Sequence, residues 1–118
     1  MSRPKLFSVA KSGLNANVFI DQAKAFYDRT AKKGERVILL EGSILKAPDN
    51  TKWIYRDLEI LAIHGYLERI GTQYRVKRPI AGSTSGTAAA VLGAGFKPAG
   101  FHRWKFNNGR SIYESGEK

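Results

Sequence analysis

Residues 50–78 constrain the fold of this chain more than any other stretch. Apolar side chains recur there at the spacing of one buried helix face: Ile54, Leu58, Leu61 and Ala62. Gly65 follows as a left-handed helix stop, and two short segments that alternate as strands do come next. The stretch therefore predicts a helix over residues 51–64 and a basic β-hairpin over residues 66–77.

The order of residues within this stretch carries a family resemblance. Thr51 supplies a hydroxyl and Arg56 a cation, and the stop His64-Gly65-Tyr66-Leu67 precedes an arginine-bearing hairpin. Residues 17–78 thus resemble a bacterial or archaeal winged helix-turn-helix domain. The resemblance implies an α+β fold, with about three helices and a β-hairpin wing, that binds double-stranded DNA.

A physical argument for DNA contact stands beside the resemblance. An α-helix fits the major groove, and side chains near its start reach the base edges. Arg56 is the strongest candidate, because a guanidinium contacts a base or a phosphate bidentately. Cations on the hairpin would lie along the DNA backbone and add affinity that depends on salt. The predicted contacts are Thr51, Lys52, Tyr55 and Arg56 on the helix and Arg69, Arg75, Lys77 and Arg78 on the hairpin.

The preceding part of the chain predicts the remaining helices of this fold. Asn15 and Asn17 are good N-cap residues, and apolar side chains at helical spacing run to the stop at Gly34. We therefore expect a helix over residues 17–33. Residues 35–47 suit a short strand or turn leading into a short helix, and their pattern leaves strand and helix both open.

Composition divides the chain into four parts. Residues 1–14 form a basic arm, and residues 15–79 form the winged helix domain. Residues 80–95 are rich in Gly, Ser and Ala, which is the composition of a linker, although residues 87–95 also allow a short helix capped by Thr87 that the glycines limit. Residues 96–118 combine aromatic and basic side chains, and Asn108-Gly109 predicts a β-hairpin there.

This C-terminal extension allows two interpretations. Alternating aromatic and basic residues suit a single-stranded nucleic-acid surface, where rings stack on bases and cations follow the backbone. The same pattern also suits a hairpin whose aromatic face packs on the main domain or associates with another copy. The predicted tail contacts are Arg103, Trp104, Lys105 and Arg110.

Charge and residue types limit the classes of function. Twenty Lys and Arg against ten Asp and Glu give a formal charge of +10, so nucleic acid is the first partner to expect and an anionic membrane the second. The chain has no cysteine, which excludes disulfides and thiolate metal sites. His64 and His102 are the only histidines and lack an acid cluster. We therefore expect no enzyme, metal or cofactor.

The start of the chain has no apolar signal-peptide core, and no run is long enough to span a membrane. We expect a cytoplasmic, nucleoid-associated homodimer that binds double-stranded DNA as a transcriptional regulator or a plasmid or phage maintenance factor. The alternative is a protein-interaction module of a replication or transcription complex, with the extension capturing the protein partner. A single-stranded nucleic-acid or RNA binder that uses the extension is the other alternative.

Overall fold

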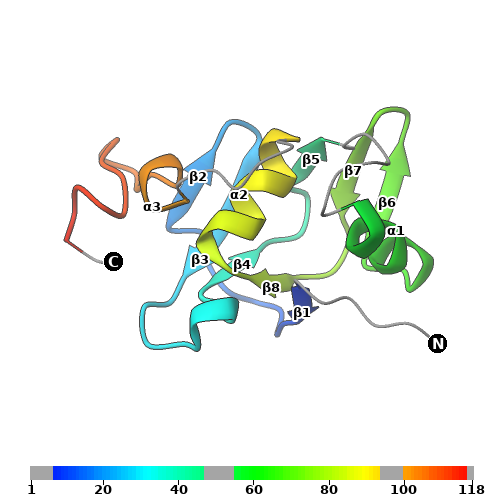
Figure 1. Ribbon diagram of the computed structural model, residues 1–118, viewed down its shortest axis with the longest axis horizontal. Coiled ribbons are helices and arrows are strands. Elements are labelled where there is room, and N and C mark those ends of the chain that lie inside the picture. Colours follow the sequence, from blue (N-terminus) through cyan, green and yellow to red (C-terminus); the bar gives the residue numbers. More distant parts are fainter. Residues whose placement is uncertain (1–6, 47–54, 94–99, 117–118) are drawn as a thin grey trace.

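The fold of this computed structural model is mostly β, with residues 7–46, 55–93 and 100–116 described. Within these ranges the chain forms eight strands in two antiparallel sheets, two nine-residue helices and two shorter helical turns (Figure 1). The winged helix core of about three helices is therefore wrong. Residues 1–6 of the predicted arm, and the predicted contacts Thr51 and Lys52, lie outside the described residues.

The larger sheet carries the first half of the chain and one late strand. Its order is β1 (Phe7–Val9), β8 (Ile80–Gly82), β4 (Val37–Leu39), β3 (Ala23–Tyr27) and β2 (Val18–Ile20). One face points into the core and includes the buried residues Val18, Ala25, Val37, Leu39 and Ile80. The short 3-10 helix η1 (Lys33–Glu35) lies in the connection between β3 and β4.

The helix predicted over residues 17–33 is instead the β2–β3 hairpin. Val18, Ile20, Ala23, Ala25 and Tyr27 are buried at the two-residue period of strands on either side of a two-residue turn. Asn17 does not cap a helix: its side-chain oxygen accepts from the Tyr27 amide at 2.7 Å, and its side-chain nitrogen donates to the Tyr27 carbonyl at 3.2 Å.

The smaller sheet contains the predicted hairpin. Its order is β5 (Ile44–Lys46), β7 (Gln73–Val76) and β6 (Leu67–Ile70), with α1 (Tyr55–Ile63) packed against β6 (Figure 1). The predicted helix is confirmed over its described part, and so is the hairpin. The helix proposed for the end of residues 35–47 is wrong, because β5 pairs with β7 there.

Helix α2 (Thr84–Leu92) is buried and joins the two sheets, because it contacts β4 and β8 of one and β5 of the other. Ser83 caps it by accepting from the Gly86 amide at 2.9 Å, and Gly93 ends it with φ of 66°. Residues 80–93 thus form a strand and a helix rather than a linker. Their small side chains reflect close packing: a Cβ on Gly82 would lie 2.9 Å from the Phe7 ring.

The C-terminal residues dock on this core after α3 (Gly100–Arg103). Trp104 and Ile112 are fully buried, so this part packs on the main domain. In place of the predicted hairpin, the structure has a turn at Asn108-Gly109 and an isolated β-bridge between Lys105 and Ser111. No helix among the described residues has the length and apolar character needed to cross a membrane.

Candidate functional site

Three of the predicted DNA-contact residues on α1 and the β6–β7 hairpin, all arginines, are paired with acids. Arg56 pairs with Asp57 at 3.2 Å and Arg69 with Glu59 at 3.2 Å, while Arg75 pairs with Glu68. Glu59 also accepts from the Tyr74 hydroxyl at 2.5 Å, which ties α1 to the hairpin. A phosphate would have to compete with these pairs for each of the three arginines.

Two further predicted contacts lie where the hairpin leads into β8. Lys77 and Arg78 are exposed, and the Arg78 guanidinium lies 5.9 Å from the centre of the Tyr66 ring. Between residues 55 and 78 the sequence places five cations against three acids. The charge excess of this end of the molecule is therefore small, and most of the positive charge lies elsewhere.

The predicted tail contacts separate into a buried residue and exposed ones. Trp104 is fully buried, and its indole Nε1 donates to the Thr87 hydroxyl at 3.0 Å. That hydroxyl in turn donates to the Ser83 carbonyl at 2.8 Å. Arg103 and Lys105 are exposed, and Arg110 donates to the Glu114 carbonyl at 3.3 Å. Trp104 thus holds the tail in place, whereas its neighbours are presented to solvent.

Arg103 and Lys105 border a concave site beside β2, the last strand of the larger sheet, and we call this site the β2 hollow. It has a volume of about 560 Å³. Its lining consists of Phe19, Ile20, Asp21, Leu92, His102, Arg103 and Lys105. The apolar side chains come from β2 and the end of α2, and the cations come from α3 and the residues after it. The lining therefore combines the rings of Phe19 and His102 with two permanent positive charges and one acid.

The backbone fixes the aromatic ring of the hollow between two lysines. Phe19 lies directly opposite Lys24 on β3 and directly opposite Lys105 on its other side. The Phe19 amide donates to the Lys105 carbonyl at 2.8 Å, and the Lys105 amide donates back at 3.2 Å. Opposed residues of antiparallel strands share a face of the sheet, so the three side chains form one row, the Phe19 row.

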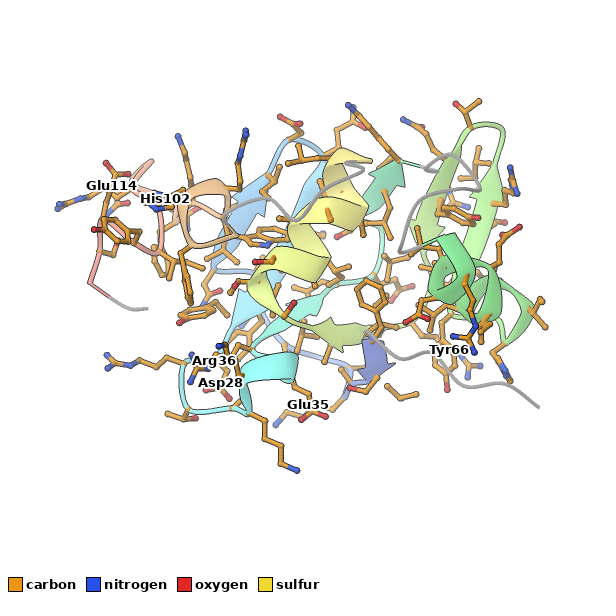
Figure 2. All side chains as sticks on the ribbon, in the orientation of Figure 1. Asp28, Glu35, Arg36, Tyr66, His102 and Glu114 are labelled. Atoms are coloured by element: carbon orange, nitrogen blue, oxygen red, sulfur yellow. The ribbon has the colours of Figure 1, made fainter. Side chains whose placement is uncertain are left out.

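Residues that follow α3 contact the α3 residues at the rim of the hollow and hold them in place. The His102 and Tyr113 rings stack with their centres 4.4 Å apart, and the Tyr113 amide donates to the Phe101 carbonyl at 2.9 Å. Figure 2 shows His102 and Glu114 at the same end of the molecule. Hydrogen bonds from the Ser111 backbone and side chain lower the pKa of Glu114, which keeps this acid ionised. The acid is thereby engaged within its own turn.

Sequence reasoning missed Phe19, Lys24 and Asp21 as members of a site. All three belong to the helix that the sequence predicts over residues 17–33, where they would not lie beside residues of the tail. The alternation of Val18, Ile20, Ala23, Ala25 and Tyr27 was the signal that places Phe19 and Lys24 together on the opposite face. No local pattern connects Phe19 to Lys105.

Neither a metal-ligand cluster among the described residues nor a similarity to known proteins helps to assign this site. Within the described ranges, no three His, Asp or Glu side chains gather as the ligands of a metal ion would. The chain matches no protein-family model, no curated protein and no solved structure.

Proposed function

We propose that this chain binds single-stranded nucleic acid at the β2 hollow. The observation that carries the proposal is the Phe19 row, in which an aromatic ring is fixed between Lys24 and Lys105 beside a concave surface. Single-strand binding sites combine a ring that stacks on a base with cations that follow the phosphates. Both components are contributed here by side chains held on paired backbone.

Different residues of the hollow contact the base and the phosphates. A base stacks on the half-buried Phe19 ring, which lines the hollow together with Leu92. Arg103 and Lys105 are exposed at the border and hold the adjoining phosphates. The formal charge of +10 raises the local concentration of any nucleic acid and speeds its association.

A single strand is preferred over a duplex because the base must leave its stack to reach the ring. The concave lining suits one splayed base rather than a paired helix. The alternative duplex face on α1 and the hairpin would require Arg56, Arg69 and Arg75 to exchange an acid for a phosphate. Duplex DNA binding, a protein partner and a homodimer stay predictions of the sequence, and duplex DNA is one arm of the test.

Fluorescence anisotropy with labelled strands of about 12 nucleotides, within the range of known site sizes, tests the proposal. We expect single strands to bind more tightly than duplex DNA or duplex RNA. We expect Phe19→Leu to weaken binding about tenfold, since stacking of one base contributes about 1–3 kcal/mol. Arg103→Gln combined with Lys105→Gln should lower the slope of log affinity against log salt by about 1.4.

The single variant Lys105→Gln should also weaken binding. Lys33→Gln is its matched control, because Lys33 is an exposed lysine on η1, on a separate element from the hollow. The control removes the same charge and should change affinity much less. Equal losses in the two variants would mean that only net charge matters. Tighter binding to duplex, with Phe19→Leu unaffected, would move the site to the α1 face and overturn the proposal.

A further inference from the structure

We propose that a groove next to the β2 hollow is a second nucleotide subsite, which reads a base through its hydrogen-bonding edge. This inference rests on the proposed single-strand function. The groove, called here the turn groove, has a volume of about 260 Å³. Its lining consists of Asp21, Gln22, Ile44, Lys46, Gln73 and Val91.

The hollow and the groove meet at the β2–β3 turn. Asp21 lines both, so the first residue of this turn separates one cavity from the other. The end of α2 also reaches both, with Leu92 in the hollow and Val91 in the groove. A strand whose base stacks on Phe19 therefore places its next nucleotide over Asp21 and into the groove.

The polar side chains of the groove are held by paired strands. Lys46 on β5 lies directly opposite Gln73 on β7, so both side chains share one face of the smaller sheet. The Ile44 amide donates to the Gln22 carbonyl at 3.4 Å, which joins β5 to the β2–β3 turn. Gly93 leaves room for the lysine, since a Cβ there would lie 2.9 Å from the Lys46 Cβ.

The chemistry of the groove differs from that of the hollow. Gln22 and Gln73 each offer an amide that donates and accepts, and Asp21 offers a carboxylate that only accepts. A carboxylate accepts hydrogen bonds from the exocyclic amine of cytosine, and a glutamine amide pairs with adenine. Lys46 is the one cation in the groove lining and is suited to the phosphate.

The groove therefore prefers a base with an exocyclic amine over thymine or uracil, which have none. Thymine and uracil present a carbonyl where cytosine presents its amine, and that carbonyl would face the Asp21 carboxylate without a proton between them. The hollow provides a stacking surface and positive charge but does not discriminate between bases. Discrimination between bases comes from the groove.

Anisotropy with oligo-dC and oligo-dT, repeated with oligo-rC and oligo-rU, tests this division. We expect wild-type protein to bind the cytosine strands about tenfold more tightly, the size of one well-made base contact. Asp21→Asn should lower the ratio to about threefold or less, because the amide loses one acceptor position. Asn also tolerates the left-handed backbone at this turn, where φ is 48°. Gln73→Ala should lower the ratio too, while leaving affinity for oligo-dT unchanged.

Glu41→Gln is the matched control, because Glu41 is an exposed acid that lines neither cavity. It raises the net charge as Asp21→Asn does, so it should strengthen binding to both strands and keep the tenfold ratio. A wild-type ratio near one, with Phe19→Leu still weakening binding, would overturn the base-reading subsite and leave the hollow intact. Absence of binding to every strand would overturn both proposals.

Discussion

A single buried hydroxyl connects the tail to the central helix. The Thr87 Oγ1 accepts from Trp104 Nε1 at 3.0 Å and donates to the Ser83 carbonyl at 2.8 Å, so each polar atom of this contact has a partner. Thr87 and Trp104 are both fully buried, which removes water as a substitute. The strength of the tail's attachment therefore depends on one side-chain contact as well as on packing.

Thr87→Val keeps the shape of the side chain and leaves the indole N–H without an acceptor. We expect it to lower the free energy of unfolding by about 1–3 kcal/mol, the cost of a buried unsatisfied donor. Thr87→Ser keeps the hydroxyl and is the control for this contact. Urea denaturation of wild type and both variants measures the difference. A larger loss in the Ser variant than in the Val variant would show that the methyl group, not the hydrogen bond, carries the stability.

At the scale of elements, α3 is positioned by a residue without a side chain. A Cβ on Gly100 would lie 2.2 Å from the Thr84 carbonyl carbon, so the start of α3 touches the backbone of α2. Neither backbone yields to such an overlap without separating the two helices. The hollow depends on this approach, since its cations lie on α3 and directly after it.

We expect Gly100→Ala to lower the free energy of unfolding by at least about 1–3 kcal/mol, the usual cost of overpacking, because the overlap here is with backbone. Gly34→Ala is its control, because a Cβ on Gly34 meets no atom within 4 Å. The control should change stability by less than about 0.5 kcal/mol. Thermal unfolding followed by circular dichroism compares the two. A Gly100→Ala protein as stable as the control would contradict the observed helix contact.

Two of the elements made from neighbouring residues were predictable from the sequence. The α1 helix and the β6–β7 hairpin depend on local spacing and on the stop at Gly65, and the structure confirms both over the described residues. The helix prediction for residues 17–33 was wrong because their apolar positions satisfy both a helical period and a strand period. Pairing of β3 with β4 decides between the two, and that contact lies outside any local window.

The site was less predictable than the fold because it joins distant segments. Lys105 belonged to a recognised aromatic and basic pattern, but its partner Phe19 was assigned to another element. The small residues of the segment 80–95 predict a linker, whereas the structure has β8 and α2 there. Their size instead allows β8 and α2 to approach their neighbours closely, and composition alone does not separate these two causes.

At the scale of the whole molecule, positive charge opposes the compact state. A formal charge of +10 on 118 residues repels itself when the chain folds, and salt screens this repulsion over about 10 Å at 0.1 M. We therefore expect the Tm to rise as sodium chloride increases from low concentration to about 0.15 M. Differential scanning calorimetry across that range checks the direction. A falling Tm would show that the ion pairs on α1 and the hairpin outweigh the general repulsion.

The place of β8 in the sheet has a consequence for how the chain is made. β8 pairs with β1, where Phe7 lies opposite Gly82, and it also pairs with β4. These two earlier strands therefore cannot complete their pairing until β8 has been synthesised. During synthesis the emerging chain therefore carries an unpaired edge on β4 until Ile80–Gly82 leaves the ribosome. Completion of the larger sheet is thus a late event, and translation products that stop before β8 retain an edge open to aggregation.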